Sequence, residues 1–327
     1  MSGRGARQGW CLATVVVTGS AGFIGSHVVR ALLARGDAAG GVGKFDPFFK
    51  GRPKTSDAAA AGGAELVEGD LCDAEVVRAL LMRVRPEGII HLAAKAGVRP
   101  SLRDPVGYAR TNVLGTQIVL NEAARAGVSR VVIASSSSVY GNNRKVPFSE
   151  GDPVDAPVSP YAATKKACEL IAHVHAVTTG MPTACLRFFT VYGERQRPDL
   201  AISLFMRRIA KGEPIEMFGD GSMSRDFTYV GDIVRGVLAA YDRIGDFGYR
   251  VWNLGSDRPV RLDDLIAKVS KTVGREATIE RSPASPADVD RTWADLTRAH
   301  AELGYRSTMN FEEGLARQWE AERQRTV

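Results

Sequence analysis

The sequence predicts an α/β fold: a doubly wound parallel sheet with a smaller C-terminal lobe. The first observation is the Val-Val-Val run at 15–17, because a short β-branched run is typical of a strand buried on both faces. The second is a helical pattern over 23–35 that ends at Gly36. The third is the repetition of such strand and helix pairs, which predicts right-handed crossovers within one sheet.

The later elements follow the same alternation, and Ser159 and Pro160 suit the cap and first position of a helix. After about Gly193, prolines and the Gly219-Asp220-Gly221 turn interrupt shorter elements, which predicts a second lobe. We expect strands at 38–42, 64–67, 88–92, 130–134 and 183–188, and helices at 74–84, 106–126 and 160–179. We assign residues 1–192 and about 231–257 to the sheet domain, with 233–241 and 251–254 returning to the sheet, and 193–230 and 258–327 to the lobe.

Composition narrows the class of protein. The 327 residues are 44% hydrophobic and 24% charged, so the chain can bury a large core without disulfide or metal staples. The net charge of +6 comes from scattered basic residues, which argues against nucleic-acid binding. No apolar stretch resembles a signal sequence or a membrane span, so we expect a cytoplasmic protein. The cysteines lack zinc-site spacing and are expected to be reduced thiols, with no metal bound: Cys11, Cys72, Cys168 and Cys185.

A glycine-rich turn follows the first strand. Residues 18–25 place glycines at Gly19, Gly22 and Gly25, with Phe23 and Ile24 opening the helix. Glycines at this spacing allow a tight turn and let the backbone approach a pyrophosphate. The helix N-terminus then presents its N–H groups to the anion. The sheet domain is therefore predicted to be a dinucleotide-binding Rossmann domain.

The end of the second strand leaves the choice of dinucleotide open. An acidic residue there would hold the adenine ribose of NAD, but the sequence has Gly43 followed by Lys44. Either NAD binds without that carboxylate, or Lys44, Arg52 or Lys54 pairs with the 2′-phosphate of NADP. We favour NAD, because lysine lacks the fork geometry of arginine.

Tyr161 and Lys165 are the predicted catalytic pair. Residues four apart share one helix face, so the phenol and the ammonium can point into the same cleft. A lysine cation favours a phenolate, which can act as a general base. Ser136 lies in the serine run that ends the strand before this helix, at the edge of the sheet where ligands bind. We expect its hydroxyl to bond the substrate oxygen and to relay the proton.

Further motifs accompany the glycine turn and the Tyr161–Lys165 pair. They are His91-Leu92-Ala93-Ala94, Asn112-Val113-Leu114-Gly115-Thr116, Ser-Ser-Ser-Ser-Val-Tyr-Gly at 135–141, Arg187-Phe188-Phe189-Thr190-Val191-Tyr192-Gly193, Gln196-Arg197-Pro198-Asp199 and Arg225-Asp226-Phe227-Thr228-Tyr229. Together they resemble the extended short-chain dehydrogenases/reductases over residues 14 to about 320. Within that family, the sequence is most similar to the nucleotide-sugar 4-epimerases, in particular the UDP-glucuronate 4-epimerases.

The resemblance implies roles for individual residues. Asp70 and Leu71 match a segment beside adenine, and Asn112 a polar anchor behind the active lysine. The implied cofactor contacts are Gly19, Gly22, Phe23, Ile24, Gly25, Lys44, Asp70, Leu71, Leu92, Ala93, Ala94, Lys95, Asn112, Tyr161 and Lys165. The implied substrate contacts are Arg99, Ser137, Ser138, Thr190 and Arg197 around the sugar, Arg225 at the diphosphate and Asp288 near the uridine ribose.

The resemblance also implies an activity. No carboxylate follows Ser136 in residues 137–139, whereas relatives that dehydrate or decarboxylate the sugar carry acids in this segment. This absence favours NAD-dependent 4-epimerisation of a UDP-sugar, UDP-glucuronate to UDP-galacturonate, through a 4-keto intermediate. The alternatives are a nucleotide-sugar reductase, dehydrogenase or decarboxylase of the same family, and a non-catalytic cofactor-binding protein. A homodimer through the helices around 106–126 and 160–179 is implied as well.

Overall fold

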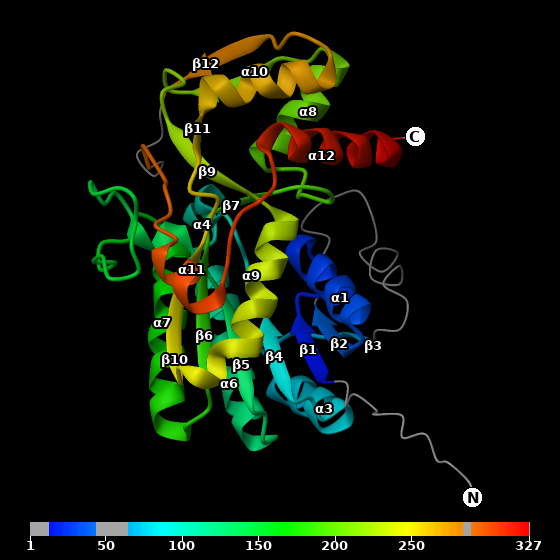
Figure 1. The fold of residues 1–327 in the computed structure, drawn as a ribbon, viewed down its shortest axis with the longest axis vertical. Coiled ribbons are helices and arrows are strands. Elements are labelled where there is room, and N and C mark those ends of the chain that lie inside the picture. The colour runs from blue at the N-terminus through cyan, green and yellow to red at the C-terminus, as the bar shows by residue number, and fades with distance from the viewer. Residues whose placement is uncertain (1–12, 44–64, 284–288, 327) are drawn as a thin grey trace, which may run out of the picture.

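The structure is a computed structural model that describes residues 13–43, 65–283 and 289–326. Its centre is a seven-stranded sheet in which all neighbouring strands are parallel (Figure 1). Chain order reverses between β1 and β4, so the crevice outside their carboxyl ends is a topological switch point. Across the sheet the strands are β10 (Tyr249–Leu254), β6 (Thr183–Phe188), β5 (Arg130–Ser136), β4 (Gly88–His91), β1 (Thr14–Thr18), β2 (Ala38–Gly43) and β3 (Glu65–Glu68).

Helices cover both faces of this sheet, and the buried side chains of β1 alternate between them. Val15 and Val17 are 0% exposed and pack with the helices of one face, whereas Val16, at 1%, packs with those of the other. The first face carries α1 (Phe23–Arg35) and α9 (Val230–Arg243), and the second carries α3 (Ala74–Val84), α6 (Gly115–Arg125) and α7 (Pro160–Thr179). The predicted doubly wound sheet is confirmed, including the return of 251–254 as β10.

Helix α7 begins and ends at the residues that the sequence marks. The Ser159 hydroxyl accepts the N–H of Ala162 at 3.2 Å, Pro160 occupies the first turn, and Gly180 ends the helix with a φ of 72°. The helix expected over 106–126 is continuous but not uniform. It consists of α5 (Pro105–Tyr108), the π-helical η1 (Ala109–Leu114) and α6. The π segment places Asn112 inside the protein, where it is 1% exposed.

A second layer lies above the carboxyl ends of the main strands (Figure 1). Its larger sheet joins β7, β9 and β11, and its smaller sheet pairs β8 with β12. The division of the chain into two domains at residue 193 stays a prediction. The elements are β7 (Thr190–Tyr192), α8 (Ala201–Lys211), β8 (Ile215–Phe218), β9 (Ser224–Tyr229), β11 (Pro259–Arg261), α10 (Leu262–Val273), β12 (Ile279–Ser282) and α12 (Phe311–Thr326). The remaining short helices are α4 (Val98–Arg103), η2 (Ser137–Tyr140), η3 (Ile244–Asp246) and α11 (Thr297–Leu303).

The buried carboxylate of Asp226 fastens three segments of this layer together. It is 0% exposed and accepts backbone N–H groups from Ser256 at 2.7 Å and from Asp257 and Ala294 at 3.1 Å. Burial raises its pKa, an effect that these N–H donors oppose. The donors hold the segment that follows β10 and the segment around residue 294 against β9.

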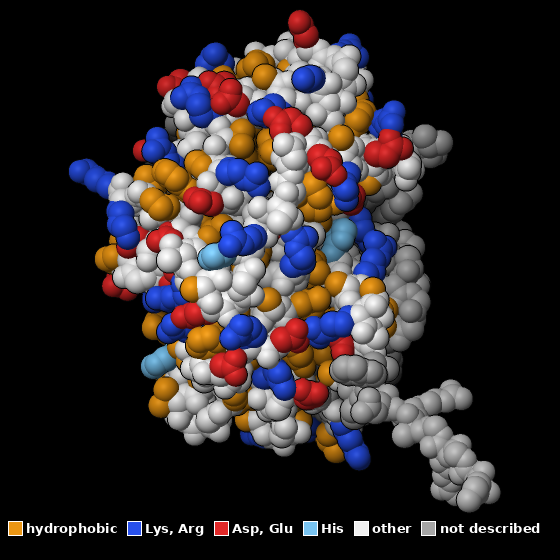
Figure 2. All heavy atoms as spheres, viewed as in Figure 1, with side chains coloured by type: hydrophobic (Ala, Val, Ile, Leu, Met, Phe, Trp, Pro, Cys, Tyr) orange, Lys and Arg blue, Asp and Glu red, His pale blue; other side chains and the backbone are white. Residues whose placement is uncertain are grey.

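On the face seen in Figure 2, basic and acidic side chains are intermingled rather than gathered into a stripe of one sign. This distribution agrees with the scattered charge of the sequence.

Candidate active site

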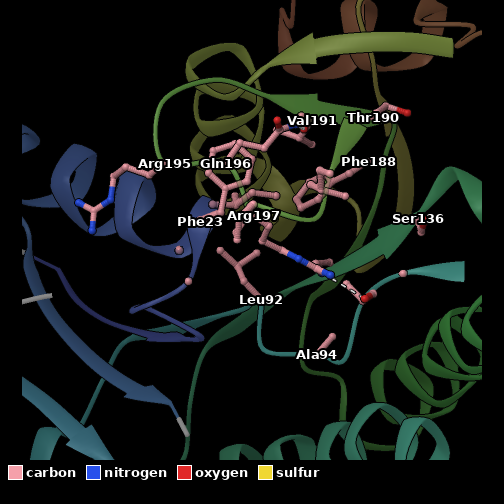
Figure 3. A pocket seen from close by; sticks show the side chains of 18 of the residues that line it. Phe23, Leu92, Ala94, Ser136, Phe188, Thr190, Val191, Arg195, Gln196 and Arg197 are labelled. Atoms are coloured by element: carbon pink, nitrogen blue, oxygen red, sulfur yellow. Dashed lines mark hydrogen bonds between the residues drawn. The ribbon is translucent and has the colours of Figure 1, made fainter. Parts of the chain in front are cut away.

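A cavity of about 1240 Å³ lies at the carboxyl ends of the main strands, beneath the upper layer. Its walls come from the turn after β1 and from the segments that follow β4, β5 and β6, closed by α8 and α12 (Figure 3). Of the predicted site residues it brings together Gly22, Phe23, Ile24, Gly25, Leu92, Ala94, Ser136, Ser137, Ser138, Tyr161, Lys165, Thr190 and Arg197.

The glycine turn forms one end of the cavity, and its backbone leaves no room for side chains. Gly19 has a φ of 69° and its N–H donates to the carbonyl of Val42 at 2.7 Å. A Cβ on Gly25 would lie 2.1 Å from the Gly19 carbonyl oxygen. Gly22 caps α1 without a side-chain hydrogen bond, so no side chain competes with a ligand for the N–H groups of the first turn. This cradle fits the pyrophosphate of a dinucleotide.

Behind this turn, Ala93 and His91 lock β4 against β1. A Cβ on Gly19 would lie 2.9 Å from the backbone of Ala93, whose N–H donates to the Thr18 hydroxyl at 3.1 Å. The ring nitrogens of His91 lie 2.7 Å from the Thr18 hydroxyl and 3.0 Å from that of Thr116. Burial, with a smaller contribution from the Lys165 cation, lowers the pKa of His91 to about 3. His91 is therefore neutral at physiological pH.

Lys95 and Asn112 lie behind the cavity wall rather than on it. The Asn112 amide accepts the N–H of Lys95 at 2.8 Å and donates to the Lys95 carbonyl and the Thr164 hydroxyl, both at 3.0 Å. Asn112 thus ties the segment after β4 to α7. The Lys95 ammonium turns to Asp104 at 2.6 Å.

Ser136, Tyr161 and Lys165 all line this cavity. Lys165 is 5% exposed, and its ammonium donates to the carbonyl of Ala134 at 2.7 Å, which fixes it against the end of β5. The Ser136 hydroxyl donates to that of Ser138 at 3.0 Å. The ring of Tyr161 meets the ring of Tyr108 edge to face, with centroids 6.2 Å apart.

A buried ion pair supports the serine run from behind. Arg187 donates to both oxygens of Glu169 at 2.8 Å, and both side chains are 3% exposed. Glu169 also accepts a hydrogen bond from the Ser135 hydroxyl at 2.6 Å. Because this bond engages the Ser135 hydroxyl, Ser135 does not compete with Ser136 for the predicted contact to the substrate oxygen. Hydrogen bonds to Glu169 and Tyr140 raise the pKa of Arg187 and outweigh the effect of burial. Ser136 therefore directly follows two residues, Ala134 and Ser135, that α7 holds through Lys165 and Glu169 respectively.

Arg197 lines the same cavity as the serine run and Thr190. Its guanidinium donates to the carbonyl of Ala96 at 3.1 Å (Figure 3). It also donates to both oxygens of Asp199 at 3.1 and 2.7 Å. Tyr108 donates to the same Ala96 carbonyl at 3.0 Å. The contact to Ala96 bridges the segments that follow β4 and β7 across the cavity.

Other predicted site residues lie outside this cavity, and their roles stay predictions. The Arg99 guanidinium stacks 3.8 Å from the ring centroid of Phe218 in β8. Arg225 donates to the carbonyls of Ser224 and Asp290. Asp70 accepts the N–H of Cys72, which lowers its pKa, and it also pairs with Arg110 at 3.1 Å; Leu71 is buried in the core. Lys44, Arg52, Lys54 and Asp288 lie outside the described residues.

The cavity also has walls that the sequence analysis did not assign. Phe188 ends β6 and Phe189 directly follows it, so the rule that selected the serine run at the end of β5 would have found them. The cavity is also lined by Arg207 and Lys211 of α8 and by Trp319 and Arg323 of α12. No local sequence pattern marks these residues as part of a site. Only the packing of the upper layer brings these side chains to the cavity.

In the described part of the chain, no cluster of three or more His, Cys, Asp or Glu side chains could hold a metal ion. Over the same residues, no helix has the length and apolar character that crossing a membrane requires.

Comparison with known proteins agrees with this geometry. The NAD dependent epimerase/dehydratase family matches residues 15–255. UDP-glucuronate 4-epimerase 5 of Arabidopsis thaliana is 41% identical in an alignment 320 residues long, which covers 92% of this chain and 73% of that protein.

Two solved structures are similar along nearly the whole chain. MoeE5, solved with NAD and either UDP-glucose or UDP-glucuronic acid, is 38% identical, with TM-scores of 0.87 and 0.85 and coverage of 96% of this chain and 100% of that one. The UDP-glucuronic acid 4-epimerase of Bacillus cereus, in complex with UDP-glucuronic acid and NAD, is 32% identical with a TM-score of 0.87, covering 95% and 99% of the two chains.

Proposed function

This chain belongs to the NAD-dependent epimerase/dehydratase family, and from that premise we propose that it interconverts UDP-glucuronate and UDP-galacturonate by epimerisation at C4. The observation that carries the proposal is one cavity, whose walls include the glycine turn, the Ser136–Tyr161–Lys165 group and Arg197. NAD is the cofactor, since the neighbouring structures contain it and the Gly22–Gly25 cradle fits its pyrophosphate.

The chain's own residues handle the proton at the sugar hydroxyl. Tyr161 takes the proton from the 4-hydroxyl oxygen, O4, while C4 of the sugar is oxidised. Ser136 donates a hydrogen bond to the same oxygen. Lys165, held on the Ala134 carbonyl, places a positive charge beside the site where the phenolate forms. NAD, when bound, would supply a reversible acceptor for the hydride from C4. The 4-keto sugar then rotates within the cavity and presents its opposite face. Tyr161 returns the proton to O4 as C4 is reduced again.

The sugar end of the cavity suits a uronic acid. Ser137, Ser138 and Thr190 offer hydroxyls to the hexose, and Arg197 offers a guanidinium to the carboxylate. Residues 137–139, directly after Ser136, are Ser-Ser-Val and supply no acidic side chain for proton transfer at C5. The 4-keto sugar is therefore returned to a hydroxyl and is not dehydrated.

Turnover of UDP-glucuronate by the purified, NAD-loaded protein tests the proposal. We expect UDP-galacturonate to form without net NADH, and deuterium at C4 to remain in the product. Tyr161→Phe should lower kcat by roughly a hundredfold or more, since the general base is lost. Lys165→Met should also lower it strongly, whereas Lys166→Met, a neighbour that does not line the cavity, serves as the matched control. Full activity of Tyr161→Phe would contradict the mechanism, and stoichiometric use of NADH would indicate a reductase.

A homodimer is also part of this proposal. Leu170, Val174 and Val177 of α7 are 55%, 59% and 69% exposed and share one helix face, and Val106 on the adjacent α5 is 78% exposed. Packing of this apolar face against the same face of a second copy would bury it. Light scattering should give twice the chain mass for the native protein and a monomer for Val174→Glu. A native monomer at micromolar concentration would contradict the interface.

The cytoplasmic location expected from the sequence belongs to the proposal too. It is supported by the described cysteines, Cys72, Cys168 and Cys185, which are all free thiols.

A further inference from the structure

Two neighbours, Ala96 and Asp199, hold the Arg197 side chain where it lines the cavity. Its Nη1 donates to the Ala96 carbonyl at 3.1 Å, while Nε and Nη2 donate to the two carboxylate oxygens of Asp199 at 3.1 and 2.7 Å. Arg197 lines the cavity and Asp199 does not, so the carboxylate holds the guanidinium from behind. Figure 3 shows the arginine side chain extended across the cavity between Leu92 and Phe188.

We propose that Asp199 is a positioning residue that orients Arg197 toward the sugar carboxylate, and that it thereby sets the preference for a uronic acid over a neutral hexose. This inference rests on the proposed function. An arginine binds a carboxylate well only when the plane and edge of its guanidinium are set correctly. The bidentate contact to Asp199 fixes one edge, and the contact to Ala96 fixes the rotation about that edge.

Asp199 could also repel the substrate carboxylate, but two features favour orientation over repulsion. The Asp199 side chain is 37% exposed, so solvent screens its charge. Its geometric constraint on Arg197, a long side chain with four rotatable bonds, is not screened. Arg197 itself is only 20% exposed, which keeps the contact with an incoming carboxylate partly desolvated and strong.

The chain offers a matched control for this pair. Arg261 and Asp263 have the same spacing and the same two-bond geometry, with Nε and Nη2 donating at 3.0 and 2.6 Å. Neither residue lines the cavity. Asp263→Asn therefore removes the carboxylate from a pair with the same bonding geometry, at a position outside the cavity.

The experiment measures KM, kcat and equilibrium Kd for UDP-glucuronate and UDP-glucose with NAD-loaded protein. Asp199→Asn should raise KM and Kd for UDP-glucuronate roughly tenfold, with a much smaller effect on kcat. KM and Kd for UDP-glucose should change less than about twofold, since that sugar presents no carboxylate. Asp263→Asn should alter neither substrate. In an Arg197→Gln background, Asp199→Asn should have no further effect, because the group that it positions is gone.

Asp199→Glu separates orientation from charge and guards against a poorly folded Asn variant. It keeps the charge but moves the carboxylate, so orientation predicts weaker UDP-glucuronate binding, whereas charge repulsion predicts no change. Equal effects on both sugars, no effect, or tighter UDP-glucuronate binding by Asp199→Asn would each overturn the inference. If the native protein binds UDP-glucuronate without epimerising it, the proposed function fails, but the Kd values still decide the role of Asp199.

Discussion

Replacing His91 by asparagine should flatten the dependence of stability on pH. The imidazole is 3% exposed and lies between two threonine hydroxyls, and burial lowers its pKa from 6.5 to about 3. Because the folded pKa lies below the unfolded one, acid protonates His91 preferentially in the unfolded chain. Stability is therefore lost as the pH falls from about 6.5 towards 3. His91→Asn keeps a polar side chain at the position but does not titrate.

The size of the effect follows from linkage. One pH unit below the unfolded pKa costs about 1.4 kcal/mol, so a fall from pH 7 to pH 5 should cost about 2 kcal/mol through His91 alone. For a chain of 327 residues, this corresponds to a decrease in Tm of about 3 °C. Burial also lowers the pKa of His27 and His175, which adds to the slope equally in both proteins.

Urea unfolding between pH 5 and pH 7 would measure this difference directly. The native protein should lose about 2 kcal/mol more than His91→Asn across that interval, even though the variant is less stable overall. His300→Asn is the control, because His300 is exposed and the same substitution there removes no buried imidazole. Parallel pH profiles of the native protein and His91→Asn would refute the assignment of a neutral, buried imidazole.

Three further predictions concern the glycine turn, the buried ion pair and the tyrosine beside Tyr161. Gly25→Ala should weaken NAD binding roughly tenfold or more in calorimetry, because the added Cβ would lie 2.1 Å from a backbone oxygen. Gly245→Ala is the control, because Gly245 has open space around it. Equal NAD affinities of the native protein and Gly25→Ala would contradict the role of the cradle. Glu169→Gln should cost about 3 kcal/mol of unfolding free energy in urea, since Arg187 stays charged and buried; a loss below about 1 kcal/mol would argue against this. Tyr108→Leu should lower kcat more than Tyr108→Phe, because only the ring reaches Tyr161; equal kcat values would show that the ring contact is unimportant.

Much of the fold could be predicted because its signals are local. Val15–Val17 announces a strand buried on both faces, and Ser159, Pro160 and Gly180 mark the ends of α7 through backbone hydrogen bonds within a few residues. The glycine turn is marked in the sequence by its glycine spacing, although in the structure its Gly19 N–H donates to Val42 of the neighbouring strand β2. The π-helical turn at Asn112 was not predicted, because contacts to Lys95 and Thr164, distant in sequence, stabilise its position.

The candidate site divides in the same way. The sequence by itself determined that Ser136 ends a strand at the edge of the sheet where ligands bind, and that Tyr161 and Lys165 share one face of the following helix. Only the tertiary structure decided that the Ala96 carbonyl holds Arg197 and that α12 closes the cavity. Such contacts join segments far apart in the chain, and their free energy depends on distances that no local pattern encodes.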